Sequence, residues 1–311
     1  LKPNSRDIFT GTPPLAFTYG LGGLLLFPMA VGASVLLIES YSPKSLIEAI
    51  KQHDVTVLFT APTMYRTLTS LVADISVPSL RICNSAGEFL PKTTWEDWFN
   101  TTGLPIHDGI GTTEMLHTFI AGRGQAIRPG ATGQTIPGFE ATVLDEAGHK
   151  APVGKVGRLA VRGPTGCRYL ANPDRQASYS INGWNLTGDS YLLDEDGYFW
   201  YQARTDDMII SAGYNISGPE IEAVLMEHRS VADCAVVASP DPERGQIVKA
   251  YIVPSEGHKP DGDLVQALQD YVKSAIAPYK YPRAVEFIDA LPRTATGKIQ
   301  RFVLRQLARS N

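Results

Sequence analysis

The chain has 311 residues, 43% of them hydrophobic, and a formal net charge of −4. This is enough for one large domain or two unequal domains with buried cores. The acidity, with no interleaving of basic and aromatic residues, excludes nucleic acid as an expected partner. Three widely spaced cysteines form neither a metal pattern nor a disulfide framework, so a reducing cytoplasm is the expected location.

The run at residues 14–38 carries no charge and could be taken for a membrane span. It contains Pro28 and four glycines, and these breakers favour a loop, a short helix and a buried strand at residues 33–39 instead. We therefore predict no membrane span.

Strands and helices alternate over the first hundred residues. Ser42 is a typical N-cap with Pro43 in the first turn, and the apolar residues that follow share one helix face. Strands are predicted at 55–60 and 81–85, and helices at 63–72 and 92–100. The alternation predicts a parallel sheet with right-handed crossovers. From residue 130 to about 206, glycine, proline and short alternating strands predict a mostly β subdomain.

A smaller unit is expected after Asp206. Ser217 and Glu220 have the spacing of a capping box at the start of a helix. Strands at 235–239 and 249–253, a helix at 264–276, a strand at 284–288 and a helix from 299 follow. The predicted fold class is α/β with a mixed sheet and a β subdomain for residues 1–206, plus a small α+β domain for residues 207–311.

Two short segments carry residues suited to nucleotide chemistry. In residues 108–114 (DGIGTTE), small residues admit a close ligand, hydroxyls can donate to phosphate, and Glu114 can hold Mg²⁺. Asp189 follows a Thr-Gly pair and can accept hydrogen bonds from ribose hydroxyls. Taken alone, each segment has an ordinary turn as its alternative, an Asx turn in the case of Asp189.

Two further segments belong to the C-terminal third. Residues 204–214 (RTDDMIISAGY) lie at the expected domain junction and form either a surface ion-pair cluster or a hinge. Residues 291–298 (LPRTATGK) end in Lys298, either a solvated lysine or a point charge for a phosphate under attack. Residues 271–311 hold eight basic and two acidic side chains, as expected of a solvated helix face or of a patch that receives phosphates.

Together these segments resemble, in order and spacing, the adenylate-forming superfamily of acyl-CoA synthetases, peptide-synthetase adenylation domains and luciferases. Residues 14–23 (PLAFTYGLGG), 85–88 (SAGE) and 108–117 (DGIGTTEMLH) are similar to benzoate- and aminobenzoate-CoA ligases. Residues 239–242 (SPDP) and 277–283 (APYKYPR) also look like medium-chain acyl-CoA ligases.

The resemblance implies a ligase that uses ATP and Mg²⁺ to activate a carboxylic acid and then transfers the acyl group to coenzyme A. It implies catalytic roles for Lys298, Thr113 and Glu114, with Glu114 also the metal ligand, and a hinge at Asp206. It implies a nucleotide site of Ser85, Ala86, Gly87, Glu88, Asp108, Gly109, Ile110, Asp189 and Arg204, and a coenzyme A channel at Gly213 and Tyr214.

The acid itself is expected to be aromatic. Tyr19 stands among glycines, where a flat ring could lie against backbone, and His117 could hydrogen-bond a ring substituent. The expected acid pocket comprises Tyr19, Gly20, Gly22, Gly111, Met115 and His117. Tyr19 and Met115 could equally be ordinary core residues, and His117 a satisfied polar side chain.

The chain departs from the family pattern in two ways. Ala203 stands where a glycine usually precedes the hinge arginine, and the Ser/Thr/Gly-rich phosphate loop of the family is not in this sequence. We therefore expect a truncated chain that by itself binds ATP weakly. The alternatives are a medium-chain fatty acyl-CoA ligase, a peptide-synthetase-type module that serves a carrier protein, and a non-catalytic adenylate-binding or scaffold protein.

Overall fold

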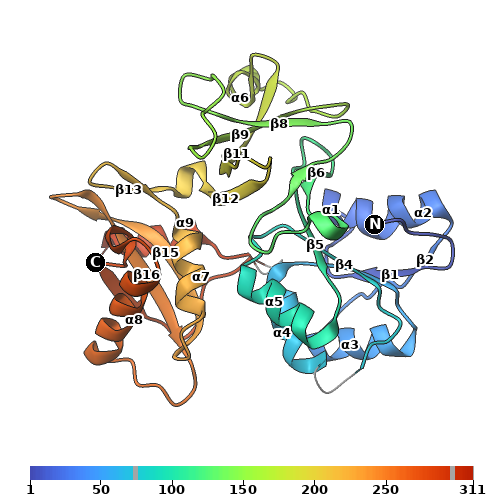
Figure 1. Ribbon diagram of the computed structural model, residues 1–311, viewed down its shortest axis with the longest axis horizontal. Coiled ribbons are helices and arrows are strands. Elements are labelled where there is room, and N and C mark those ends of the chain that lie inside the picture. Colours follow the sequence, from blue (N-terminus) through green and yellow to red (C-terminus); the bar gives the residue numbers. More distant parts are fainter. Residues whose placement is uncertain (73–75, 295–297, 311) are drawn as a thin grey trace. The chain divides into compact units, whose positions relative to one another are not determined.

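The computed structural model describes residues 1–72, 76–294 and 298–310. The chain forms two compact units, residues 1–187 with 191–201, and residues 188–190 with 202–311 (Figure 1). The α/β, β and α+β regions expected from the sequence are all present, so the predicted fold class is confirmed. The domain boundary predicted after Asp206 lies near the start of the second unit and stays a prediction.

A seven-stranded mixed sheet organises the first unit, in the order β2-β1-β3-β4-β5-β6-β7. The strands from β2 to β5 in this order run parallel, and β6 and β7 are each antiparallel to the strand before them. The bounds are β1 Ile8–Gly11, β2 Ser34–Val35, β3 Val57–Thr60, β4 Ile82–Ala86, β5 Ile106–Gly111, β6 Thr118–Ala121 and β7 Gln134–Thr135.

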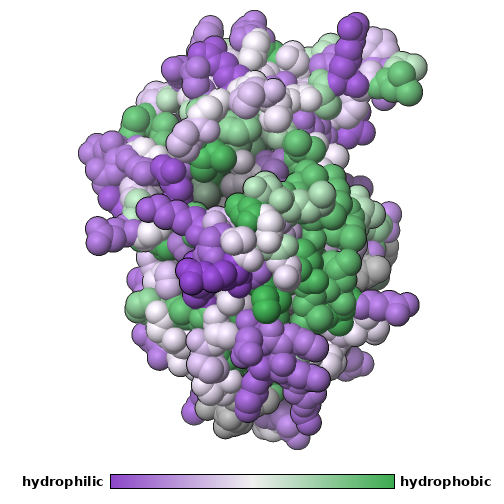
Figure 2. All heavy atoms as spheres, turned by 90° about the vertical axis from the view of Figure 1, so that its right-hand side faces the viewer, coloured by the Kyte–Doolittle hydropathy of each residue, from purple (hydrophilic) through white to green (hydrophobic). Residues whose placement is uncertain are grey.

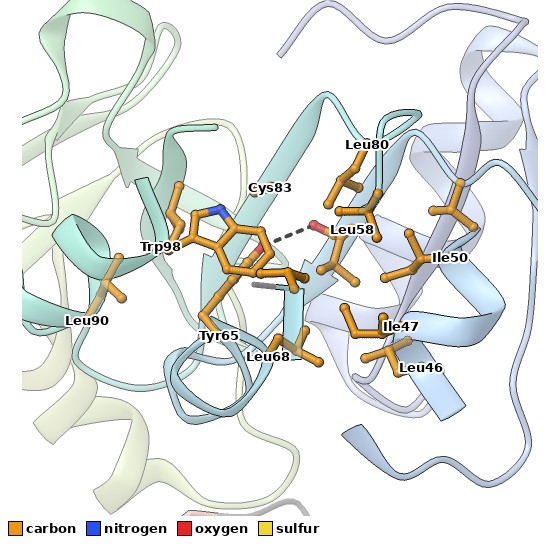
Figure 3. Close-up of a cluster of buried hydrophobic side chains, with 14 residues drawn as sticks. Leu46, Ile47, Ile50, Leu58, Tyr65, Leu68, Leu80, Cys83, Leu90 and Trp98 are labelled. Carbon is orange, nitrogen blue, oxygen red and sulfur yellow. Dashed lines mark hydrogen bonds between the residues drawn. The ribbon is translucent and has the colours of Figure 1, made fainter. Parts of the chain in front are cut away.

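Helices cover both faces of the parallel strands. On one face, α3 (Pro43–Gln52), α4 (Pro62–Val72) and α5 (Lys92–Thr102) enclose the core cluster of Figure 3. There the ring of Tyr65 meets that of Trp98 edge-on, with 5.0 Å between centroids. The other face carries α1 (Thr18–Leu21), the π-helical turn η1 (Gly22–Leu26) and α2 (Phe27–Val31). Because side chains alternate along a strand, Leu58 enters the first core and Val57 and Phe59 the second.

The uncharged run after Pro14 differs from the prediction. Helical turns follow one another without a break over residues 18–31, more than the short helix expected. The buried strand expected at 33–39 is only the two-residue β2, because β2 lies at the sheet edge and pairs with β1 alone. No helix among the described residues has both the length and the apolar character needed to cross a membrane.

The face that carries α2 exposes apolar side chains (Figure 2). Leu25, Leu26, Phe27 and Met29 are each more than a third exposed. Beside them lies an apolar hollow, lined by Leu1, Pro3, Phe9, Phe27, Ala30, Val31, Val57, Phe59 and Ile82. A continuous apolar area of this kind is typical of an interface.

The rest of the first unit is the β subdomain. Its sheet has the order β10-β11-β9-β8, with β12 paired to β11. Residues of β6 share one core with β8, β9, β11 and β12, which joins the subdomain to the larger sheet. The bounds are η2 Gly124–Ala126, β8 Glu140–Leu144, β9 Val156–Arg162, α6 Pro173–Tyr179, β10 Ser180–Ile181, β11 Trp184–Leu193 and β12 Phe199–Arg204.

The second unit has a three-stranded sheet of β15 (Val231–Asp241), β16 (Gly245–Pro254) and β17 (Ala284–Phe287). Helices α7 (Gly218–Met226) and α8 (Gly262–Ala275) pack on one face, and α9 (Arg301–Ser310) packs on the other. The remaining elements are η3 Thr205–Asp207, β13 Ile209–Ser211, β14 Tyr214–Ile216 and η4 Pro278–Lys280.

The start of α7 matches half of the predicted capping box. The hydroxyl of Ser217 accepts a hydrogen bond from the backbone N–H of Glu220 at 3.2 Å. The carboxylate of Glu220 is bound by Lys280, whose Nζ lies 2.6 Å from Oε1. The predicted capping box would have the Glu220 carboxylate bind the backbone N–H of Ser217. In the structure this carboxylate binds Lys280 instead, a residue distant in the sequence.

Candidate nucleotide and acid site

The carboxyl ends of β4 and β5 bring two predicted segments together. These strands are parallel neighbours, with Ser85 opposite Asp108 and Ala86 opposite Gly109. Residues 85–88 and 108–111 therefore lie at the same sheet edge, where open α/β sheets usually bind ligands.

Two carboxyl groups at this edge have different environments. Burial raises the pKa of Asp108 to about 8. The Oε2 of Glu88 accepts hydrogen bonds from the hydroxyl of Thr63 at 2.6 Å and from its backbone N–H at 3.3 Å. Glu88 thus stabilises the start of α4, whatever else it binds.

Glu114 lies in the turn that follows β5. Its Oε1 accepts a hydrogen bond of 2.7 Å from the hydroxyl of Tyr169. Burial alone would raise the pKa of Glu114, but the hydrogen bond from Tyr169 and the nearby Arg175 guanidinium hold it below the usual value. Glu114 is therefore an anion near neutral pH.

One carboxylate of this kind fits Mg²⁺ that arrives with a nucleotide, because Mg²⁺ usually takes one or two carboxylates and completes its shell with phosphates and water. The part of the chain that the structure describes holds no group of three His, Cys, Asp or Glu residues that could hold a metal by themselves. Substrate phosphates would supply the other ligands.

The residues predicted for the acid pocket are partly gathered around His117. Its ring lies edge-on to Phe27, with 4.6 Å between centroids, and 5.9 Å from the ring of Tyr19. Burial lowers the pKa of His117, and a hydrogen bond to the backbone of Tyr19 partly offsets this, so the imidazole is neutral near pH 7. Its Nε2 is buried and has no hydrogen-bond partner among the described residues.

The other predicted pocket residues have clear packing roles. Met115 is 1% exposed and belongs to the core of the β subdomain. The hydroxyl of Tyr19 lies 2.9 Å from Oδ1 of Asn84. A Cβ at Gly20 would lie 2.2 Å from the carbonyl oxygen of Pro14, and one at Gly111 would lie 2.5 Å from that of His117. These contacts require glycine with or without a bound acid.

The second unit brings Asp189 and Arg204 together. The Nη1 of Arg204 lies 3.2 Å from Oδ1 of Asp189, whose side chain is 8% exposed against 52% for the arginine. Gly188, with φ of 79°, leaves room for the guanidinium, since a Cβ there would lie 2.8 Å from Nη2. The arginine thus holds a buried carboxylate in the position predicted to bind ribose.

The predicted hinge and channel residues lie at turns. Asp206 is exposed in η3, and its neighbour Asp207 is paired with Arg305 of α9. Gly213, with φ of 82°, forms the turn between β13 and β14. The ring of Tyr214 stacks on that of Tyr279, with 4.6 Å between centroids.

Lys298 is exposed at the end of its predicted loop. Its backbone N–H donates to Oγ1 of Thr294 at 3.1 Å, and the N–H of Thr294 donates back to its carbonyl oxygen at 2.8 Å. Residues 295–297 of the loop lie outside the described residues. Thr294 and Lys298 are therefore hydrogen-bonded to each other, shortly before α9 begins at Arg301.

The sequence reasoning missed three contacts. Tyr169 binds Glu114, Phe27 packs on His117, and Arg305 pairs with Asp207. Only Arg305 had a signal, as one of the basic residues of the last helix. The aromatic partners follow from the fold and from no local pattern.

Comparisons with known proteins identify the family. Residues 1–169 match the model of the AMP-binding enzyme family, and residues 220–298 match its C-terminal domain. The benzoate–CoA ligase of Thauera aromatica is 39% identical over 96% of this chain and 58% of its own length. The human mitochondrial acyl-coenzyme A synthetase ACSM3 is 37% identical over 96% of this chain and 53% of its own. The chain thus spans little more than half the length of these curated relatives.

Solved structures are similar too. The anthranilate CoA ligase AuaEII in complex with anthranoyl-AMP has a TM-score of 0.93 and 37% identity, over all of this chain and 61% of that one. A benzoate CoA ligase from Burkholderia xenovorans LB400 has a TM-score of 0.88 and 37% identity, over 97% of this chain and 62% of that one. The chain belongs to the AMP-binding enzyme family, within the adenylate-forming superfamily that its motifs resemble.

Proposed function

We propose that this chain is part of an acid–CoA ligase that activates an aryl carboxylate of the benzoate or 2-aminobenzoate type. The acid and ATP would give acyl-AMP and pyrophosphate, and coenzyme A would then take the acyl group and release AMP. The similarity to a benzoate–CoA ligase and to an anthranilate CoA ligase supports the choice of acid.

The observation that carries the proposal is the environment of His117. Two aromatic rings flank the imidazole, and its buried Nε2 lacks a partner among the described residues. A buried polar atom without a hydrogen bond is costly, so such an atom is often a ligand contact. An aryl acid with a polar ring substituent would satisfy both the apolar wall and this nitrogen.

In the first half-reaction, a carboxylate oxygen of the acid attacks the α-phosphorus of ATP, and the bond to pyrophosphate breaks. Lys298 supplies a positive charge to the oxygens on which negative charge develops. Glu114 would hold Mg²⁺, and the cation would neutralise phosphate charge. Asp189, held by Arg204, accepts hydrogen bonds from the ribose hydroxyls.

In the second half-reaction, the sulfur of coenzyme A attacks the acyl carbonyl carbon, the thiol loses its proton, and AMP leaves. We propose that the backbone turns at Asp206 between the two steps, so that Lys298 withdraws and the turn at Gly213 reaches the thiol. The exposed position of Asp206 in a short 3₁₀ turn is compatible with such a rotation.

A medium-chain fatty acyl-CoA ligase is the second candidate. It is favoured by residues 239–242 and 277–283, which resemble medium-chain acyl-CoA ligases. The 37% identity to the human acyl-coenzyme A synthetase ACSM3 is compatible with it. The chemistry would be the same, and the difference would lie in the walls around the acyl group. The two candidates therefore predict different orders of substrate preference.

The test uses the polypeptide that the gene encodes, with benzoate, 2-aminobenzoate, hexanoate and octanoate compared by kcat/KM for thioester formation. Aryl acids should lead by about tenfold or more, since a misfitted apolar group costs about 1–3 kcal/mol. A lead for octanoate would favour the second candidate. No acid-dependent pyrophosphate release with any of the four would refute the ligase.

A variant pair tests the role of His117. His117→Leu should lower the preference for 2-aminobenzoate over benzoate by about tenfold, because it removes one hydrogen bond in a buried site. The control is His149→Leu, since His149 is exposed between β8 and β9. An unchanged preference in His117→Leu would remove the histidine from the acid pocket.

A further inference from the structure

Residues 163–179 have no role in the function proposed so far, yet they contact the turn that carries Glu114. Tyr169 lies 55 positions from Glu114 in the sequence, and its hydroxyl donates to Oε1 at 2.7 Å. Both side chains are half-buried, so water competes less for this bond than it would at an open surface.

Tyr169 is itself held in place. Its backbone N–H donates to Oε1 of Gln176 at 2.8 Å. The guanidinium of Arg175 lies 4.4 Å from the centre of its ring, and the ring of Tyr179 meets it edge-on at 5.5 Å. Gln176, Arg175 and Tyr179 all belong to α6, so this helix fixes the direction of the Tyr169 hydroxyl.

The same segment holds the turn at a second residue. The hydroxyl of Thr165 donates to the carbonyl oxygen of Met115 at 2.8 Å. Leu116 follows with φ of 72°, a strained value for a leucine. The segment therefore supports a turn that local backbone preference would not keep.

We propose that Tyr169 is a positioning residue for Glu114, in the adenylation step of the proposed function. Glu114 also accepts hydrogen bonds from the Thr112 side chain and from its own backbone N–H. A carboxylate can accept about four contacts, so the bond from Tyr169 restricts the orientation of the carboxylate and leaves an acceptor position for a cation. The hydroxyl of Tyr169 thus directs the carboxylate toward the Mg²⁺ that accompanies the nucleotide phosphates. Outer contacts of this kind commonly change metal affinity by about 10–100-fold.

Tyr169→Phe removes the hydroxyl and keeps the ring that contacts Arg175 and Tyr179. The matched control is Tyr179→Phe. It removes another tyrosine hydroxyl of residues 163–179, one that lies 3.6 Å from the sulfur of Met115 and, among the described residues, makes no contact with Glu114 that would position the carboxylate. Glu114→Gln serves as the reference for loss of the metal ligand. All three are made in the polypeptide that the gene encodes, and thermal unfolding without metal checks that each is folded.

The first measurement is binding of Mn²⁺ in the presence of a non-hydrolysable ATP analogue, followed by the electron paramagnetic resonance signal of free Mn²⁺. The second is the Mg²⁺ concentration that gives half-maximal pyrophosphate release. Tyr169→Phe should raise both midpoints about tenfold, Glu114→Gln should raise them at least as much, and Tyr179→Phe should change them less than twofold.

The proposal is overturned if Tyr169→Phe follows the wild type in the Mn²⁺ titration, or if Glu114→Gln does so. It is also overturned if Tyr179→Phe shifts the midpoint as far as Tyr169→Phe, since the effect would then be general loosening of the segment. If the wild type releases no pyrophosphate with any acid, the proposed function fails, and the Mn²⁺ titration alone decides the role of Tyr169.

Discussion

The ion pair between Asp207 and Arg305 allows a test of how firmly the segment after the proposed hinge belongs to the second unit. Asp207 directly follows Asp206, and Arg305 projects from α9. On that helix Leu304 is fully buried, and its carbonyl oxygen accepts from the hydroxyl of Tyr251 at 3.3 Å. The pair therefore ties residue 207 to the core of the second unit, directly after the position that we propose as the hinge.

Replacing Arg305 by methionine keeps a long apolar side chain and removes the charge. Exposed ion pairs contribute about 0–1 kcal/mol, and breaking a buried pair costs about 3–5 kcal/mol. The side chains of Arg305 and Asp207 are 24% and 16% exposed, which places this pair between the two cases. We expect a loss of about 2 kcal/mol, or roughly thirtyfold in the opening equilibrium of η3 and α9.

Hydrogen exchange read by mass spectrometry measures this opening in the 311-residue chain. All four tryptophans (Trp95, Trp98, Trp184 and Trp200) lie in the first unit, so their fluorescence in urea reports on that unit alone. Arg305→Met should speed exchange in residues 205–211 and 301–310 about thirtyfold and leave the tryptophan transition in place.

Arg309→Met is the matched control, because Arg309 is an exposed arginine of the same helix. Asp207→Asn combined with Arg305→Met should recover part of the loss, since the uncompensated carboxylate is then gone. If Arg305→Met exchanges no faster than Arg309→Met, the pair does not hold the segment and the reasoning is refuted.

Three further predictions concern the reaction and the buried acid. Lys298→Ala should lower adenylation by about 10²–10³-fold and spare thioester formation from supplied acyl-AMP, as measured by separate assays of the two steps; equal losses would contradict the assignment. Asp206→Pro should retain one half-reaction and lose the overall reaction, because proline fixes φ at the proposed hinge; near wild-type ligation would exclude Asp206 from that role. The third variant, Asp108→Asn, tests a pH dependence. Burial raises the pKa of Asp108 from 3.8 to about 8 in the folded protein, so the folded state retains the proton over this range. Wild-type stability should therefore fall as the pH rises from about 4 to about 8. Thermal unfolding should therefore favour the asparagine variant by at least about 1 kcal/mol more at pH 8.5 than at pH 5, and a constant difference would show that Asp108 is ionised throughout.

Local patterns predicted the helices well. Ser42 caps α3 as expected, and Leu46, Ile47 and Ile50 are fully buried, because an amphipathic stripe with its cap encodes both the helix and its inner face. The prediction of a strand at residues 33–39 was wrong beyond the two residues of β2, because no comparable local signal supported it. A short apolar run does not encode its pairing, and β2 has a partner on one side only.

The parts of the site that depend on successive strands could be predicted from the sequence. The contacts between residues far apart in the sequence could not. The opposition of Ser85 and Asp108 follows from two successive parallel strands, whose ends must meet at one edge. The hydrogen bond from Tyr169 to Glu114 links residues 55 positions apart, and nothing local marks the tyrosine as a partner. Likewise, Arg305 was one of several equivalent basic residues until the fold placed it against Asp207.

The glycines of the expected acid pocket are explained by backbone packing and not by a slot for an aromatic ring, at least at Gly20 and Gly111. A slot for an aromatic ring predicts open space beside each glycine, yet added Cβ atoms at Gly20 and Gly111 would meet backbone oxygens of the protein itself. Backbone cannot move aside as a side chain can, so these two positions require glycine for packing alone. At Gly22 the added Cβ would lie 2.3 Å from Cδ2 of His117, which belongs to a side chain and not to the backbone. Within this motif, the support for an aryl acid therefore comes from Gly22 beside His117, and Gly20 and Gly111 add nothing to it.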